Sequence, residues 1–181
     1  MMAPFTKPTD GKYRLNQFME VFSRESDRGV AVLSMCVLEE RIRDGISARL
    51  GHYADRMLAT LAPRGRWSVM ADSAWMLGLL STADRNDLAI LVDVRNRFAH
   101  RALHDLSFDH ADIVHQMARL TIDERFRMNG VRKVSARTAF MNAVAVLHIF
   151  VELRMERASP LTEAQDLRFQ EVDDDEAHDH V

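Results

Sequence analysis

Apolar residues recur at intervals of three and four positions along most of this chain, the spacing of helices that bury one face. The pattern begins near Tyr13 and continues to about Arg157. The 181 residues include only seven glycines and four prolines, too few for the many tight turns of an all-β fold. Hydrophobic residues make up 47% of the chain, enough for the core of one domain. The sequence therefore predicts an all-α fold, an antiparallel helical bundle of about five to seven helices.

Capping residues give the expected ends of these helices. A long helix is expected from about Ser26 to Gly51, because glycine is the usual residue just beyond a helix C-terminus. The pattern weakens after Gly51, and Pro63 and Gly65 indicate a loop before Trp67. Asn129-Gly130 is a turn signal that is also compatible with a short hairpin. The other expected helices cover residues 69–80, 81–99, from 107 to about 120, and 135–157.

Three regions are expected along the chain: a flexible leader over 1–12, a single helical-bundle domain over 13–160 and an acidic, disordered tail over 161–181. From Glu171 onward the chain holds six acids and no lysine or arginine. Without them, the remaining 24 bases face 21 acids, so the net charge of the rest is about +3. This charge is too small to indicate a nucleic-acid-binding protein by itself.

Cysteine content and hydropathy bear on the compartment. The single cysteine, Cys36, lies in an apolar run and cannot form an internal disulfide, so we expect a buried thiol in a reducing compartment. The N-terminus lacks the apolar segment of a secretory signal. No apolar stretch approaches the ~20 residues that span a bilayer. These features predict a cytoplasmic protein with no membrane segment. The absence of a Gly-rich phosphate loop or a Cys-x-x-Cys pair predicts no cofactor.

One helical stretch combines several chemically capable side chains. Successive residues of a helix are turned by ~100°, and with this spacing Arg95 lies on the same side of the helix as the apolar residues. Arg95 is therefore predicted to point toward the core. Asn96 and His100 are four residues apart and lie side by side. Asp93 and Arg97 have the same separation and are expected to pair on the exposed side. The stretch reads Val94-Arg95-Asn96-Arg97-Phe98-Ala99-His100.

A guanidinium stays charged in a protein and is costly to bury alone. Arg95 must therefore contact a carboxylate, backbone carbonyls, a partner subunit or an anionic ligand. In a purely structural interpretation, Arg95 and Asn96 hydrogen-bond to neighbouring helices, and His100 caps free carbonyls of its own helix. The candidate acidic partners on the preceding helices are Glu25, Asp27, Glu39 and Glu40.

This stretch resembles the motif of HEPN domains. In that motif an arginine and a histidine are separated by four residues, and here asparagine directly follows the arginine. The resemblance implies a helical bundle that dimerises with its motif at the subunit cleft. In the enzymatic members it implies metal-independent RNA cleavage. By this resemblance Arg95 would stabilise charge developing on the phosphate, and Asn96 would orient the site. His100 would act as general acid or base, because its unperturbed pKa lies near neutrality.

The surrounding sequence is similar to a narrower family, the mannitol operon repressor family. The similarity covers about residues 20 to 120. It implies an all-α regulator with no recognised DNA-reading module. The sequence agrees, because it contains no helix-turn-helix whose second helix presents polar side chains to bases. Beside the Arg-to-His helix, the matching segments are Glu25-Ser26-Asp27-Arg28-Gly29, Ala74-Trp75-Met76-Leu77-Gly78-Leu79-Leu80 and Ser107-Phe108-Asp109-His110.

A basic run beyond this region is a second candidate site. On a loop it could bind phosphates and guide RNA toward the motif. The alternative is a solvated turn whose charges lie beside Asp123 and Glu124. The run comprises Arg125, Arg127, Arg132 and Lys133, followed by Arg137.

The histidines and tryptophans outside the motif are not predicted to form a functional site. His100 and His104 have the spacing of two metal ligands on one helical face, but no cysteine or glutamate completes a set, so no metal is predicted. The tail pair, His178 and His180, would bind a metal only loosely. Both tryptophans, Trp67 and Trp75, are expected to be core anchors.

Our first hypothesis is therefore a non-enzymatic transcriptional regulator, a co-repressor-like interaction protein resembling the mannitol operon repressor family. It is expected to be a homodimer that acts through a protein partner such as a transcription factor, without reading DNA directly. The alternative is a HEPN-type ribonuclease that uses Arg95, Asn96 and His100, or an inactive HEPN-like subunit of a two-component system. RNA is a partner under this alternative.

Overall fold

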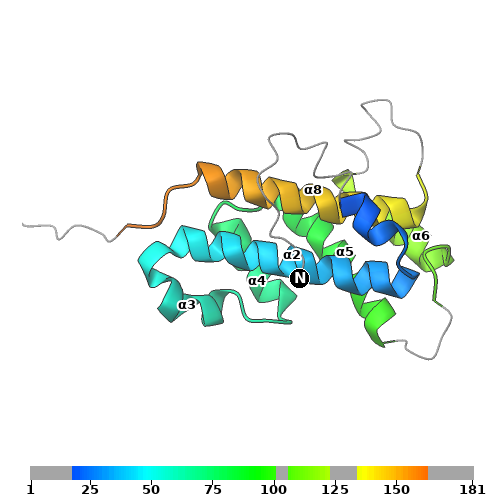
Figure 1. Cartoon of the computed structure of the whole chain (residues 1–181), viewed down its shortest axis with the longest axis horizontal. Helices are drawn as coiled ribbons and strands as arrows, with labels where there is room; N and C mark the ends of the chain where they lie inside the picture. Colours follow the sequence, from blue (N-terminus) through cyan, green and yellow to red (C-terminus); the bar gives the residue numbers. More distant parts are fainter. Residues whose placement is uncertain (1–17, 101–105, 123–133, 163–181) are drawn as a thin grey trace, which may run out of the picture.

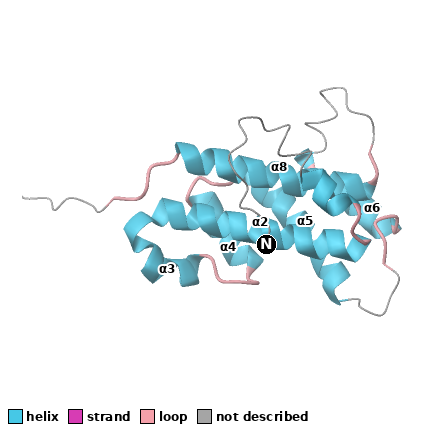
Figure 2. Ribbon diagram, in the orientation of Figure 1, coloured by secondary structure: helices cyan, strands magenta, loops and turns pink. Residues whose placement is uncertain are grey.

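The computed structural model describes residues 18–100, 106–122 and 134–162. Helices make up most of these residues, and no strand occurs among them (Figures 1 and 2). The predicted all-α bundle is confirmed. A short helical stretch over 18–23 precedes the helices whose bounds follow. These are α2 (Asp27–Leu50), the 3₁₀ helix η1 (Gly51–Tyr53), α3 (Ala54–Leu61), α4 (Trp67–Met76), α5 (Thr82–His100), α6 (Ala111–Met117) and α8 (Ala136–Arg157).

The two longest helices, α2 and α8, lie side by side along the long axis of the molecule (Figure 1). They run in the same direction, because polar contacts join their starts and, further along, Arg41 Nε donates to His148 Nε2 at 3.2 Å. Helix α5 packs against both and runs the opposite way. The shorter helices α3 and α4 lie at one end, and α6 lies at the other. The end of α5 that carries the motif is thus placed near the starts of α2 and α8.

Close packing along the α2–α8 seam depends on a glycine. A Cβ added at Gly45 would lie 3.1 Å from Val151 Cγ1 and 3.2 Å from Leu79 Cδ1, which is tighter than ordinary contact. The absence of a side chain at Gly45 lets the two helices approach each other closely. Core packing of this kind leaves little room for added volume.

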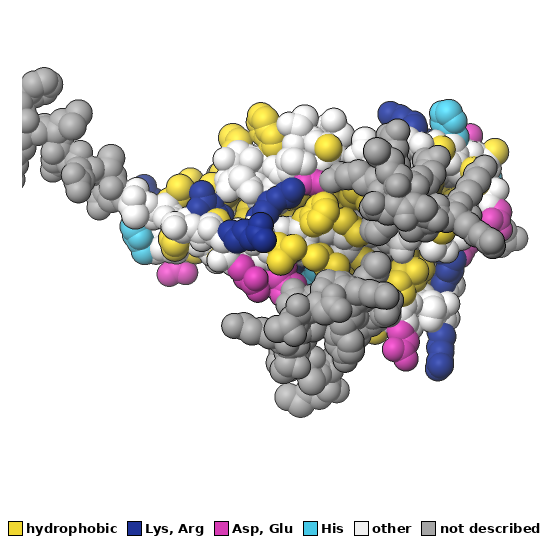
Figure 3. Space-filling view, turned by 90° about the horizontal axis from the view of Figure 1, so that it is seen from above, with side chains coloured by type: hydrophobic (Ala, Val, Ile, Leu, Met, Phe, Trp, Pro, Cys, Tyr) yellow, Lys and Arg dark blue, Asp and Glu magenta, His cyan; other side chains and the backbone are white. Residues whose placement is uncertain are grey.

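Helix α8 contributes a continuous buried segment to the core, because residues 143 to 147 are all buried. Contrary to the sequence expectation, α8 is long and apolar enough to cross a membrane by length and composition. Half of that apolar stretch is buried inside the fold, as in the core helix of a soluble domain. Apolar side chains are exposed on the face of the molecule shown in Figure 3. Among the residues of α8, Leu153 is 38% exposed.

Two aspartates on α5 are fully buried, and each stabilises a helix start. Asp84 Oδ2 accepts hydrogen bonds from the Ser81 hydroxyl at 2.6 Å, the Ser81 amide at 3.0 Å and Arg154 Nη1 at 2.7 Å. In return, Ser81 Oγ accepts from the Asp84 amide, which completes a reciprocal cap at the start of α5. Asp87 accepts from the amides of Thr121 and Ile122 and from the Thr121 hydroxyl.

Several local expectations need correction. The weakly patterned stretch after Gly51 contains α3, whose apolar residues pack against the core over only two turns. Helix α4 covers Trp67–Met76 and ends before Gly78, whose φ of 74° is outside the helical range. Cys36 is exposed, because the apolar run on α2 is wider than the face that the helix buries. The turn at Asn129-Gly130, the expected leader over 1–12 and all but the first two residues of the expected tail over 161–181 lie outside the described residues.

Candidate functional site at the end of α5

The motif residues occupy the last two turns of α5, and core packing fixes this end of the helix. Phe98, between Arg95 and His100, is fully buried. Its ring centroid lies 4.8 Å from that of Phe108, which lies 5.3 Å from that of Phe140 on α8. This aromatic row ties the motif helix to α8 and to the segment that precedes α6. The neighbouring positions on α5 are therefore held in defined directions.

Arg95 is half-buried and has no carboxylate partner among the described residues. Its Nη1 donates to Asn96 Oδ1 at 3.1 Å. Its Nε is buried and meets no acceptor in the described part of the chain. A buried donor without an acceptor is unfavourable, so this guanidinium retains the capacity to bind an anion or a carbonyl.

Three of the four acids that the sequence offered as partners for Arg95 are used elsewhere. Asp27 pairs with Arg137, and Glu40 pairs with Arg64 in an exposed contact. Glu39 accepts a hydrogen bond from the Gly65 amide at 2.8 Å. Among the described residues, Arg95 therefore forms no ion pair with an acid of the preceding helices, and its hydrogen bond goes to Asn96 of its own helix.

An open depression of about 420 Å³ lies beside the motif, lined by Asp93, Asn96, Arg97 and His100. Arg97 does not pair with Asp93 as expected. It instead contacts Asp112 of α6, with 3.4 Å between Nη1 and Oδ2. The depression therefore presents charges of both signs. Asn96 belongs to its lining and also holds Arg95, so it connects the half-buried guanidinium to the open surface.

His100 is the last residue of α5 and is exposed. An exposed imidazole can exchange protons with solvent and is accessible to a ligand in the depression. The arrangement thus places a cation with spare donors, an amide and an imidazole within the last two turns of one helix. This set can bind an anionic group, and in a suitable assembly it can transfer a proton. Among the described residues, no group of three metal-ligating side chains occurs, and His104, His178 and His180 lie outside them.

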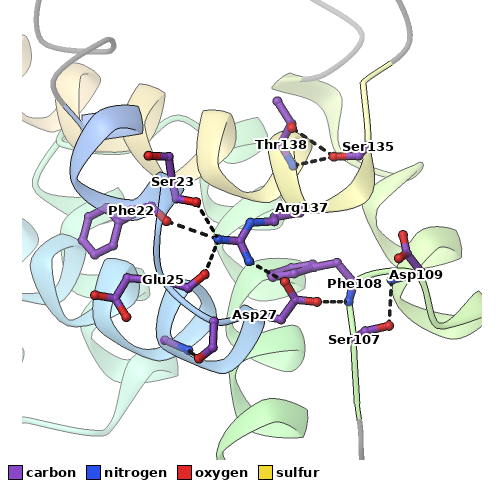
Figure 4. Close-up of polar contacts among 12 residues, drawn as sticks. Phe22, Ser23, Glu25, Asp27, Ser107, Phe108, Asp109, Ser135, Arg137 and Thr138 are labelled. Carbon is purple, nitrogen blue, oxygen red and sulfur yellow. Dashed lines mark hydrogen bonds and ion pairs between the residues drawn. The ribbon is translucent and has the colours of Figure 1, made fainter.

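The structure describes only part of the basic run. Its members Arg125, Arg127, Arg132 and Lys133 lie outside the described residues. Arg137, which follows them, does not extend into a phosphate-binding loop. Its side chain is 25% exposed, and its guanidinium contacts Asp27 and three backbone carbonyls (Figure 4). The suggestion that Arg137 contributes to an RNA-binding loop is therefore wrong.

An exposed apolar patch on α4 was missed by the sequence analysis. Trp67 is a core anchor as expected, with 6% exposure, but Trp75 is 47% exposed and Met76 is 67% exposed. Val69, seven residues before Met76 on the same side of α4, is 37% exposed. A tryptophan at a helix end gives no sequence signal that separates core from surface. We call Val69, Trp75 and Met76 the α4 patch.

Comparison of the chain with protein-family models, with curated proteins and with solved structures finds no match.

Proposed function

We propose that this protein is a non-enzymatic regulator that acts by binding a protein partner such as a transcription factor. The proposal follows the resemblance to the mannitol operon repressor family and includes a cytoplasmic homodimer. The observation that supports it best is the α4 patch. Trp75 and Met76 are consecutive, exposed residues at the end of α4. Large exposed apolar side chains mark contact sites, and tryptophan is among the residues most enriched in those that dominate binding energy.

The mixed charge of the depression on α5 agrees better with a protein partner than with a polyanion. Asp93 would repel a phosphate, and Arg97 is already paired with Asp112. A protein surface can supply both a carboxylate for Arg95 and apolar contacts for α4. The sequence also contains no helix-turn-helix whose second helix presents polar side chains to bases, so the proposal does not include direct DNA reading.

The test of this proposal compares variants of the α4 patch with a matched surface variant. We expect Trp75→Ala combined with Met76→Ala to weaken binding of the purified partner by roughly tenfold or more. Leu33→Ala is the control, because Leu33 is also 47% exposed but lies on α2. Binding would be measured by isothermal titration calorimetry. Unchanged affinity in the double variant, or tight and sequence-selective DNA binding by the wild type, would contradict the proposal.

The second candidate function is a metal-independent ribonuclease. The specific observation in its favour is the spare donor capacity of Arg95, beside Asn96 and close to an exposed His100. In this function Arg95 would stabilise charge on the phosphate, and His100 would transfer a proton. The acidic lining of the depression counts against it in a single chain.

RNA cleavage assays in the presence of a chelator test the ribonuclease. Loss of cleavage in Arg95→Ala and His100→Ala, with cleavage kept in Arg85→Ala and His52→Ala, would favour it over the regulator. Arg85 is a half-buried arginine on the same helix, and His52 is an exposed histidine remote in sequence. If the wild type cleaves neither single-stranded nor structured RNAs, the ribonuclease is excluded and the regulatory proposal remains.

A further inference from the structure

A single ion pair connects four segments of the fold near the end of α5. Arg137, in the first turn of α8, pairs with Asp27 at the start of α2. The same guanidinium donates to the backbone carbonyls of Phe22 at 3.3 Å, Ser23 at 3.4 Å and also Glu25 (Figure 4). It thereby satisfies carbonyls at the end of the helical stretch over 18–23 and in the connection to α2.

The Asp27 carboxylate has a second contact, which leads toward the motif. While one oxygen faces Arg137, Oδ2 accepts a hydrogen bond from the Phe108 amide at 2.9 Å. Phe108 is 2% exposed and lies in the segment between α5 and α6. Because both contacts involve a charged group, they are stronger and more directional than neutral hydrogen bonds. Rotation of Asp27 would break the contact with Phe108 as well.

Phe108 transmits this arrangement to α5 through its ring. The ring packs on Phe98, with centroids 4.8 Å apart. Phe98 comes three residues after Arg95 and two before His100 on the same helix. A continuous series of contacts therefore runs from Arg137 through Asp27 and Phe108 to the motif.

We propose that Asp27 and Arg137 are positioning residues that set the orientation of the last turns of α5, and with it the placement of Arg95, Asn96 and His100. The inference concerns the geometry of the motif and holds whether the protein is a regulator or a ribonuclease. Asp27 and Arg137 are separated by 110 positions in the chain, yet they act together on one helix end.

The fold supplies a matched control for this proposal. Asp84 and Arg154 form a second ion pair, which joins the start of α5 to the end of α8, far from the motif at the end of α5. Loss of either ion pair should lower the stability of the bundle. Only loss of the Asp27–Arg137 pair should change the surroundings of the motif.

The experiment uses NMR of the full chain in wild type, Arg137→Gln, Arg137→Lys and Arg154→Gln. In Arg137→Gln we expect hydrogen exchange of the Phe108 amide to be about tenfold faster or more. The reason is that Asp27, which accepts the hydrogen bond of this amide, no longer has the cation that holds its carboxylate in place. We also expect a shift of the His100 ring resonances. Arg137→Lys keeps a cation facing Asp27 and should return both signals toward those of the wild type. Arg154→Gln should lower Tm without changing either signal.

Two outcomes would overturn the proposal. One is a His100 spectrum in Arg137→Gln that matches the wild type while Tm falls. The other is an equal change in Arg137→Gln and Arg154→Gln, which would mean general loosening. If Arg137→Gln does not fold, Asp27→Asn provides the same test, because the single carbonyl oxygen of asparagine cannot replace the charged carboxylate that serves both Arg137 and Phe108.

Discussion

At the scale of single residues, the arginines of this fold differ in what surrounds the guanidinium. Arg154 neutralises a carboxylate that has no solvent exposure, and Arg137 satisfies an aspartate together with three carbonyls. Arg95 contacts only a neutral amide among the described residues. The first two arginines are therefore needed for the stability of the fold, whereas Arg95 is free to act on something that the single chain does not supply.

This difference predicts opposite results for two similar substitutions. Arg95→Met should change the free energy of unfolding by less than about 1 kcal/mol, because only one hydrogen bond to a neutral acceptor is lost. Arg154→Met should cost roughly 2–4 kcal/mol, since it leaves Asp84 buried without its cation. Urea denaturation of both variants measures the two values. A cost above about 2 kcal/mol for Arg95→Met would indicate that Arg95 has a buried acidic partner, for example in a second subunit.

Asp84 should also make stability depend on pH. Burial raises the pKa of Asp84, but hydrogen bonds from Ser81 and the contact with Arg154 outweigh burial, so the pKa lies below its usual value. A carboxyl whose pKa is lower in the folded chain stabilises the fold above its unfolded pKa of about 3.9. This contribution is lost as the pH falls through the folded pKa.

We therefore expect the stability difference between the wild type and Asp84→Asn to be constant near neutral pH and to shrink below about pH 4. Chemical denaturation between about pH 2.5 and 7, which covers the titration of carboxyl groups, measures this difference. A difference that stays the same throughout acid pH would contradict the proposed role of the ionised carboxylate.

At the scale of helices, the α2–α8 seam limits what the core can accept. Gly45→Val should destabilise the fold by about 1–3 kcal/mol, because the added methyl groups would collide with Val151 and Leu79. Ala48→Val on the exposed side of the same helix is the control for helix propensity and should cost well under 1 kcal/mol. Thermal unfolding of the two variants gives the comparison. Equal losses would mean that the seam can widen freely.

The long helices could be predicted because their signals are local. Ser81 and Ser135 cap the starts of α5 and α8, and apolar spacing continues over many turns. Helix α3 could not be predicted with the same rules, since eight residues give too short a pattern. The spacing also places Arg95 on the inward side of α5. It cannot show which acids surround that side, because the partners of Asp27 and Glu40 come from other segments.

Exposure at the edge of a helix is likewise beyond the reach of sequence patterns. Cys36 and Trp75 lie in apolar runs that look buried, and both are exposed. A helix buries a face of limited width, and only the packing of neighbouring helices decides where that face ends. The α4 patch therefore became visible only in the assembled bundle.

At the scale of the whole molecule, the predicted homodimer can be tested with the chain as it is. We expect a mass of about twice 20.7 kDa by light scattering at micromolar concentration. Cys36 is the single cysteine of the chain and is exposed, so a spin label attached there reports a distance between subunits without any substitution. A monomer mass with no intermolecular coupling would contradict the dimer.

The pairing of α2 with α8 has a consequence for biosynthesis. These two helices form the most extensive contact of the bundle, yet 85 residues separate Leu50 from Ala136. During translation, on the order of ten seconds pass between the synthesis of α2 and the synthesis of α8, which packs against it. The part of the apolar side of α2 that α8 covers stays exposed throughout that time. The nascent polypeptide is therefore a natural client for chaperones, and rapid synthesis of the last third favours a high yield of native protein.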